Sequence, residues 1–341
     1  MEYLRDQFHQ ELDADGEITI ASEVFTRHDI LKDMASEPYR IAFNEWLAER
    51  KDSLLEKADE ILARYDNKQR FDRLAAAFGP GRMIPFIGAG MSAPSGYPPW
   101  TRFLYQLCGE SHVPKANLDA MLARGEYEEA AQSLHDDLGA ALFNEQLEAT
   151  FVHEKPILGP VNYLPQLFPE SSIITTNFDP VVERVYGQAR GGASGFATTS
   201  TGNVLSEALR QMAAGSRLLI KIHGDCQQVA NRVLLRSEYD AAYADKGVQH
   251  DFFSRVMFGQ ALLFLGCSLS VDRTIAAMKK MVTDIGAARL PRHYAILELK
   301  KTDDRVARTK HLSQANIFPI WYEENEHEKS LEALFLKLLE V

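Results

Sequence analysis

The residues best suited to chemistry lie in four short segments, each directly after an apolar run. The segments are GAGMS at 88–92, TNFD at 176–179, HGD at 223–225 and GCSLS at 266–270. Imidazole exchanges protons near neutral pH. Glycine has no Cβ and lets the backbone approach a phosphate group closely. The four segments therefore indicate a site that binds a phosphorylated ligand and transfers a proton.

The apolar runs before these segments are predicted strands. They are rich in Ile, Leu and Phe and do not alternate with polar residues, which is typical of strands buried on both faces of a parallel sheet. Helical patterns separate them. The alternation predicts a Rossmann-like, doubly wound α/β fold that binds ligands beyond the carboxyl ends of its strands. The predicted strands lie at 83–88, 172–176, 217–223, 261–267, 293–299 and 317–321.

The chain divides into a helical N-terminal extension at 1–80 and a sheet domain at 81–341, with a helical insertion at about 103–165. A helix is predicted around 54–65, and a final amphipathic helix begins within 323–332. The extension either packs on its own domain or is an arm that joins subunits or receives a partner. The apolar residues expected to face inward are Leu54, Ala58, Ile61, Leu62 and Tyr65 in the first helix, and Leu331, Leu334, Phe335 and Leu338 in the last.

Composition excludes several classes of protein. The 341 residues include 37 Lys and Arg against 48 Asp and Glu, a net charge of −11, which argues against a general nucleic-acid binder. Cys108, Cys226 and Cys267 are far apart and form no C-x-x-C pair, so neither a disulfide framework nor a four-cysteine zinc site is expected. There is no signal-peptide core and no apolar run of about 20 residues. We expect a cytoplasmic protein without a membrane segment.

The segment at 88–99 can be compared with the dinucleotide-binding loop of a dehydrogenase. Its G-x-G-x-x-A pattern fits the fingerprint of a dehydrogenase. The acidic residue expected about 20 positions later would be Glu110, which lies in the helical region. The dehydrogenase interpretation therefore lacks its ribose ligand. The prolines delay the next helix until about Trp100, so the segment is either a lid-like excursion or a rigid surface loop.

The order of the motifs resembles the sirtuin family. GAGMSAPSGYP resembles the sirtuin loop GAGxSxxSGIP, and TTNFD resembles TQNID. HG at 223–224 resembles the catalytic His-Gly, and GCSLSVD resembles GTSLxVxP. The four motifs occur in the family's order over residues 83–300. The similarity is to the sirtuin-like domains of bacterial proteins, many of which are antiphage effectors that hydrolyse NAD.

The resemblance assigns expected roles by position. Asn177 would lie beside the nicotinamide ribose, Asp179 would meet the nicotinamide carboxamide, and His223 would be the catalytic histidine. Taken singly, Asp179 could instead be a helix cap, Asn177 a turn residue and His223 an ordinary strand-end histidine. The residues expected to bind the remainder of NAD are Gly88, Ala89, Gly90, Ser92, Pro98, Trp100, Thr176, Gly266, Ser268, Leu269 and Glu298.

Departures from the family pattern narrow the expected activity. The family's P-D-F-R is Pro98-Pro99-Trp100-Thr101 here, so the aspartate is lost, and the arginine is absent unless Arg102 replaces it. The paired C-x-x-C motifs that hold structural zinc in deacetylase sirtuins are missing. In deacetylases the zinc module forms a wall of the acyl-lysine groove. Its absence puts protein deacylation in doubt and leaves NAD cleavage as the expected reaction.

The resemblance therefore implies an NAD+ hydrolase that forms nicotinamide and ADP-ribose, with NAD as substrate and without zinc. It also implies a homo-oligomer controlled by a separately encoded partner, an ATPase of the HerA type or, as second choice, a short Argonaute. No direct nucleic-acid or membrane contact is expected. The alternatives are a module that binds NAD or ADP-ribose without turnover and a zinc-free protein deacylase.

Overall fold

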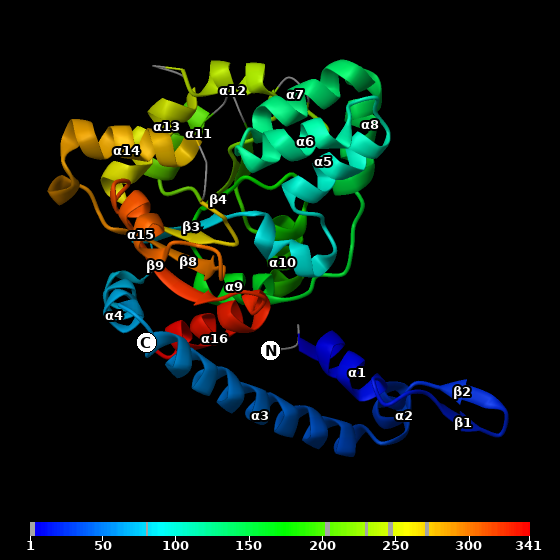
Figure 1. Cartoon of the computed structure of the whole chain (residues 1–341). Helices are drawn as coiled ribbons and strands as arrows, with labels where there is room; N and C mark the ends of the chain where they lie inside the picture. Colours follow the sequence, from blue (N-terminus) through cyan, green and yellow to red (C-terminus); the bar gives the residue numbers. More distant parts are fainter. Residues whose placement is uncertain (1–3, 80, 202–204, 229–230, 245–247, 270–272) are drawn as a thin grey trace.

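A seven-stranded parallel sheet forms the centre of the protein (Figure 1). The computed structural model describes residues 4–79, 81–201, 205–228, 231–244, 248–269 and 273–341. The strand order is β5-β6-β4-β3-β7-β8-β9, and every neighbouring pair is parallel. The strands are β3 (Met83–Ile87), β4 (Ile173–Thr175), β5 (Thr198–Thr201), β6 (Leu218–Lys221), β7 (Ala261–Leu265), β8 (His293–Leu299) and β9 (Ile317–Glu323).

This topology confirms the predicted α/β fold. From β3 the chain builds one half of the sheet through β4, β5 and β6, and then returns to the other side of β3 with β7. The sheet therefore has a switch point beside β3, and ligands bind at the carboxyl ends of strands at such points.

The apolar runs became strands because both of their faces are buried. All five residues of β3 and all five of β7 are buried. Successive side chains point to opposite faces, so Leu263 and Leu265 pack in one core and Leu262 and Phe264 in the other. The edge strand β5 has the sequence TTST and no apolar run, which is why the hydrophobic pattern missed it.

Helices cover both faces of the sheet. The predicted insertion contains α5 (Trp100–Gly109), α6 (Lys115–Ala123), α7 (Tyr127–Leu138) and α8 (Ala140–Phe151), followed by α9 (Leu164–Leu167). Phe103, Leu104 and Leu107 of α5 are buried. No helix in the described ranges is long and apolar enough to cross a bilayer. The other helices after β4 are α10 (Val181–Arg190), α11 (Leu205–Ala213), α12 (Arg236–Ala242), α13 (Val248–Gly259), α14 (Arg273–Ile285), α15 (Arg305–Ser313) and α16 (His327–Leu339).

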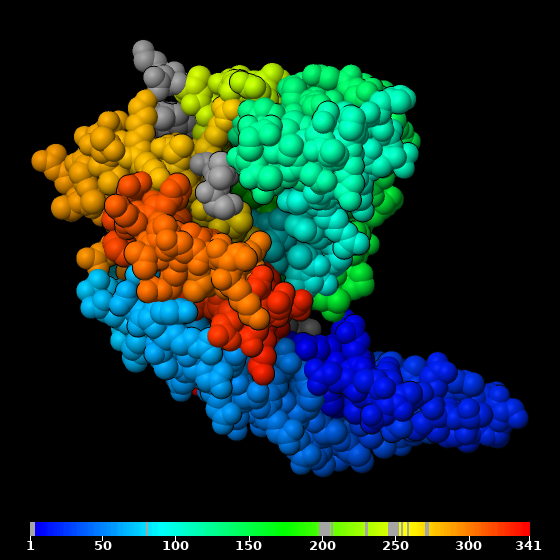
Figure 2. All heavy atoms as spheres, viewed as in Figure 1, coloured from blue at the N-terminus to red at the C-terminus, as the bar shows by residue number. Residues whose placement is uncertain are grey.

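The N-terminal segment combines helices with a small hairpin. It contains α1 (Arg5–Asp13), β1 (Ile18–Ile20), β2 (Glu23–Phe25), α2 (Arg27–Met34), α3 (Ser36–Leu62) and α4 (Asn67–Ala77). Figures 1 and 2 show α1, the hairpin and α2 extending away from the body, while the end of α3 lies along α16. The sequence did not predict the hairpin.

Packing of α3 against α16 explains their apolar faces. Leu54, Ala58, Ile61 and Leu62 are buried as predicted. Tyr65 is not on that face, because the helix ends at Leu62 and Tyr65 lies in a turn with φ +52° and an exposed side chain. The inward residues predicted for α16 are buried too, and Glu332 beside them pairs with Arg50 of α3.

The sheet contains a desolvated histidine that makes stability depend on pH. His293 is fully buried, and its Nδ1 accepts the Leu262 N–H at 3.0 Å. Burial lowers the pKa of His293 to about 3, whereas an unfolded histidine titrates near about 6.5. Below that pH the unfolded state binds a proton that the folded state refuses, so acidification destabilises the fold.

Replacing His293 by Asn should flatten this dependence, because an amide oxygen keeps the acceptor for Leu262 but does not titrate. We expect the wild-type free energy of unfolding to fall, through this residue, by about 1 kcal/mol per pH unit once the pH drops below about 6. The variant should lack that part of the slope. Urea unfolding at pH values above and below the pKa of an unfolded histidine measures this slope. The exposed His112→Asn is the control. Equal slopes in His293→Asn and wild type would contradict this account.

Candidate functional site

A cavity of about 800 Å³ lies at the carboxyl ends of β3, β4, β6 and β7. All four motif segments line it, although they come from distant parts of the chain. The helical insertion supplies a further part of its wall, including Tyr127 and Phe151. The predicted site residues that line the cavity are Gly88, Ala89, Gly90, Ser92, Pro98, Trp100, Thr176, Asn177, Asp179, His223, Gly266, Ser268 and Leu269.

Glu298 does not line this cavity. It follows the buried part of β8, but its Oε1 accepts the backbone N–H of Asn325 at 3.0 Å. The position after a strand was visible in the sequence. The direction of the side chain depends on the β9–α16 turn, which the sequence did not place.

Glycines make the floor of the cavity. The Gly88 N–H donates to Leu265 O and the Gly90 N–H to Gly266 O, both at 2.9 Å. A Cβ on Gly88 would lie 2.6 Å from Gly266 O, and one on Gly90 would lie 2.9 Å from Gly266 Cα. Gly266 itself has φ +68°, and its Cβ would lie 2.5 Å from the Met91 nitrogen. The loops after β3 and β7 can approach each other this closely only without side chains at these positions.

The proline-rich part of the first loop is tied to the body. After short 3₁₀ turns, the Tyr97 hydroxyl donates to His153 O at 2.7 Å, and Lys155 Nζ donates to Gly96 O at 2.8 Å. Helix α5 then begins at Trp100 as predicted. These bonds favour the rigid-loop alternative over a lid.

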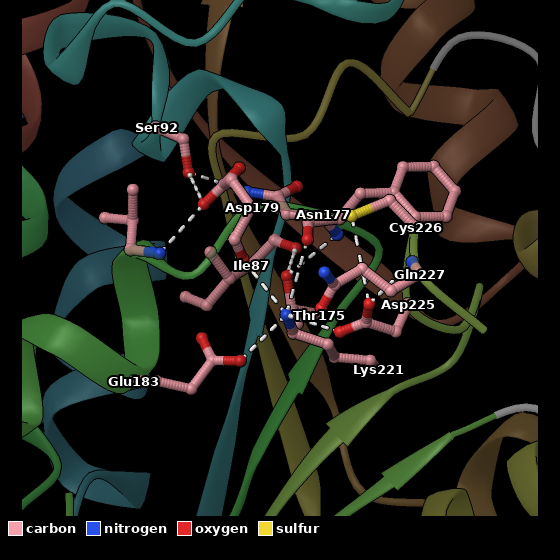
Figure 3. Close-up of polar contacts among 12 residues, drawn as sticks. Ile87, Ser92, Thr175, Asn177, Asp179, Glu183, Lys221, Asp225, Cys226 and Gln227 are labelled. Carbon is pink, nitrogen blue, oxygen red and sulfur yellow. Dashed lines mark hydrogen bonds and ion pairs between the residues drawn. The ribbon is translucent and has the colours of Figure 1, made fainter. Parts of the chain in front are cut away.

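A hydrogen-bond chain joins Asn177, Ser92 and Asp179 (Figure 3). Asn177 Nδ2 donates to Gly88 O at 3.1 Å and to Ser92 Oγ at 3.0 Å, and Ser92 Oγ donates to Asp179 Oδ1 at 2.9 Å. Because a carbonyl oxygen only accepts, these bonds fix the orientation of the amide. Asn177 Oδ1 is then left buried with no donor among the described residues, although Asn177 lines the cavity. It is a buried acceptor without a donor, in a residue that lines the cavity.

Asp179 combines two of the roles considered from the sequence. Its Oδ1 accepts the Val181 N–H at 3.1 Å in the first turn of α10, and the residue also lines the cavity. Burial raises the pKa of Asp179, while the bonds from Val181 and Ser92 and the nearby Lys221 oppose that rise. The N-cap position of α10 is Pro180 rather than Asp179, but Asp179 satisfies the first N–H of the helix and lines the cavity at the same time.

The Lys221 ammonium group bonds to the backbone of the turn that contains Asp179 (Figure 3). Its side chain is buried, and Nζ lies 2.8 Å from Glu183 Oε1, 3.1 Å from Asp179 O and 3.8 Å from Asp225 Oδ2. Burial lowers the pKa of Lys221, but the carboxylates outweigh it, led by Glu183, so the net pKa is raised and the amine stays charged. Sequence reasoning missed this residue, although a lone lysine inside the apolar run RLLIKIH was the signal.

His223 faces the cavity from the end of β6. Both ring nitrogens lie 3.4 Å from the Tyr239 hydroxyl, and the two rings meet edge to face at 5.2 Å. Desolvation lowers the pKa of His223 to about 4, so the imidazole is neutral at pH 7. A neutral imidazole is the form that can accept a proton.

An ion cluster ties the insertion to this wall. Arg273 of α14 pairs with Glu128 of α7, with Nε at 2.8 Å from Oε1, and with Asp240 of α12 at 2.7 Å. Its guanidinium also lies over the Tyr239 ring, 5.5 Å from the centroid. Arg273, Glu128 and Tyr239 all line the cavity, and the sequence singled out none of them. The cluster holds three helices around the side chain that touches His223.

Comparison with known proteins finds the same similarity as the motifs that line the cavity. Residues 171–320 match the family model of the SIR2-like domain, which spans β4 to β9. This part of the chain is similar to SIR2-like domains. The chain is 24% identical over 224 residues to Defense-associated sirtuin 2 of Bacillus subtilis, an alignment that covers 63% of this chain and 21% of that protein. The chain thus corresponds to about a fifth of that relative, and the resemblance drawn from the motifs is confirmed.

Gly88→Ala should separate the two loops, since the new Cβ would overlap the backbone oxygen of Gly266. We expect a loss of about 2 kcal/mol in the free energy of unfolding, as for overpacked cores. Gly109→Ala is the control, because its Cβ would meet no atom within 4 Å. Urea denaturation compares the two variants. An equally small effect of both would show that the close approach is not a constraint.

Lys221→Met should destabilise the fold by about 3 kcal/mol, because it leaves carboxylates around a buried position without their countercharge. Adding Glu183→Gln should recover part of the loss. Lys68→Met, in an exposed pair with Asp72, should cost less than about 1 kcal/mol. Thermal and urea unfolding measure all three variants. Equal losses at Lys221 and Lys68 would refute the supporting role of Lys221.

Proposed function

We propose that this chain hydrolyses NAD+ at the bond between nicotinamide and ribose, giving nicotinamide and ADP-ribose. The observation that carries the proposal is the pairing of two groups in one cavity, the neutral His223 imidazole and the free acceptor Asn177 Oδ1. An imidazole can take a proton from a hydroxyl or a water molecule, and an amide oxygen can orient one.

The glycine floor fits the pyrophosphate of the substrate. Gly88, Gly90 and Gly266 all line the cavity, and their lack of a Cβ lets the two loops meet at its base. A glycine-rich turn at a strand end lets a phosphate approach the backbone closely. The Gly88 and Gly90 N–H groups themselves already donate to Leu265 O and Gly266 O. We assign the phosphates to this floor and the nicotinamide half to the side where Asn177 and His223 lie.

The reaction demands little acid catalysis. The pyridinium ring leaves as neutral nicotinamide and takes the electron pair of the glycosidic bond, while positive charge develops on the ribose. A water molecule then forms the new bond to the same carbon, and its proton passes to His223. Asn177 Oδ1 would accept a hydrogen bond from the ribose or the water, and Asp179 would face the carboxamide. A largely desolvated pocket strengthens each of these interactions.

Water rather than an acylated lysine is the proposed acceptor. The sequence has none of the paired C-x-x-C motifs that accompany the peptide groove of deacetylase sirtuins. Helices of the insertion, through Tyr127 and Phe151, supply the cavity wall instead. Both observations support hydrolysis over deacylation.

We further propose a role in antiphage defence, which the name of the Bacillus subtilis relative supports. Unrestrained NAD hydrolysis would poison the cell, so the activity needs control. We place that control in homo-oligomer assembly and in a separately encoded partner, with an ATPase of the HerA type as first candidate. The segment at 1–80 is the proposed extension to the catalytic domain at 81–341, and the cytoplasm is the proposed location.

Nicotinamide release tests the proposal. Purified protein is incubated with NAD, alone and with candidate partners, and the products are separated by chromatography. Under the condition in which wild type is active, His223→Ala and Asn177→Ala should each lower the rate by at least about 100-fold, because each removes a group that acts on the reacting atoms. The exposed His112→Ala is the control.

Unchanged release by either site variant would remove that residue from the mechanism. Tight binding of NAD or ADP-ribose without turnover in any condition would instead identify a binding module. Release that requires an acylated peptide would identify a deacylase.

A further inference from the structure

His327 reaches the glycine-rich loop from outside the cavity. It is the first residue of α16, and its Nε2 lies 3.0 Å from Gly90 O. A carbonyl oxygen only accepts hydrogen bonds, so Nε2 must carry the proton and donate it. In the sequence, His327 lies within the segment predicted to begin the last helix, and its position there indicates no function.

The other ring nitrogen is fixed as well. His327 Nδ1 lies 2.5 Å from the hydroxyl of Tyr322, a buried residue of β9. Burial, together with the nearby Glu298 carboxylate, raises the pKa of Tyr322, so the phenol keeps its proton at neutral pH and donates to Nδ1. The tautomer and the ring orientation of His327 are thus set by its second partner, as in other histidines held at both nitrogens.

Gly90 is consequently held from two sides. Its N–H donates to Gly266 O, and its carbonyl accepts from His327. A Cβ on Gly90 would lie 3.0 Å from His327 Nε2, so the imidazole also closes the space behind the loop. Both polar groups of this residue are therefore fixed, and the loop is left with one conformation.

The anchor that carries His327 is itself rigid. Glu326, directly before it, pairs with Lys57 of α3 at 2.7 Å, and the buried Glu332 further along α16 pairs with Arg50. Lys337 near the end of the helix pairs with Asp59 at 2.9 Å. Ion pairs thus hold α16 against α3 along its length. The hydrogen bond from His327 in turn holds the glycine-rich loop against α16.

We propose that His327 is a positioning residue for ligand binding: it holds Gly90 in the conformation that receives the pyrophosphate of NAD. The identity of the ligand rests on the proposed function. Because the bond from His327 goes to Gly90, which has no assigned part in the chemical step, its loss should act on the affinity for NAD more than on that step.

The test separates binding from turnover. NAD affinity is measured by calorimetry, and KM and kcat are measured from nicotinamide release, for His327→Ala, His327→Gln and the control Lys329→Ala, an exposed residue in the same helical turn. Loss of one hydrogen bond should raise Kd and KM by about 3- to 10-fold in His327→Ala, with kcat within about twofold of wild type. His327→Gln keeps an N–H donor and should recover most of the affinity. Lys329→Ala should match wild type.

The outcomes distinguish this inference from the proposed function. Wild-type affinity in His327→Ala would overturn the positioning role while leaving NAD hydrolysis intact. A parallel loss of kcat and melting temperature in both His327 variants would show a merely structural role and would also overturn it. Absence of NAD binding and cleavage by the wild-type chain would overturn the proposed function, and this inference with it.

Discussion

The close approach of two loops is the constraint on which the site depends. The ladder between β3 and β7 continues past the ends of both strands, because Gly88 bonds to Leu265 and Gly90 to Gly266. The glycine-rich loop is therefore a rigid extension of the sheet rather than a flexible connection. This extension requires residues without a Cβ, because a Cβ on any of them would overlap the facing loop, and the same glycines line the cavity. One steric requirement thus serves both the fold and the binding surface.

Desolvation sets the chemical character of the polar groups around this floor. Burial keeps His223 neutral and raises the pKa of Asp179, while Lys221 supplies a compensating positive charge beneath the turn. In this network the Asn177 amide nitrogen donates to Gly88 O and Ser92 Oγ, and the Ser92 hydroxyl donates to Asp179. The Asn177 amide oxygen is left without a donor among the described residues. The site is organised before any ligand enters, which reduces the cost of ordering it on binding.

Two regions outside the sheet contact the site through a few side chains each. The insertion reaches His223 through Arg273 and Tyr239, and the α3–α16 pair reaches the glycine-rich loop through His327. A partner that displaced the insertion would affect the proposed chemical step at His223. A partner that displaced α3 or α16 would affect the proposed binding of the phosphates. These contacts give the proposed control by assembly a physical route, since packed helices transmit small displacements to the side chains they carry.

Local signals in the sequence were enough to predict the six apolar strands, the helical insertion and the order of the four motifs, because continuous apolar runs and glycine patterns do not depend on distant residues. They did not predict the TTST strand β5, whose pairing is set by its neighbour β6. They also missed Lys221, Arg273 and His327 and misplaced the side chain of Glu298. The bond from His327 to Gly90 joins residues 237 positions apart. Contacts of this kind come from the tertiary packing alone, because the direction of a side chain depends on how distant elements meet and not on the residues beside it in the chain.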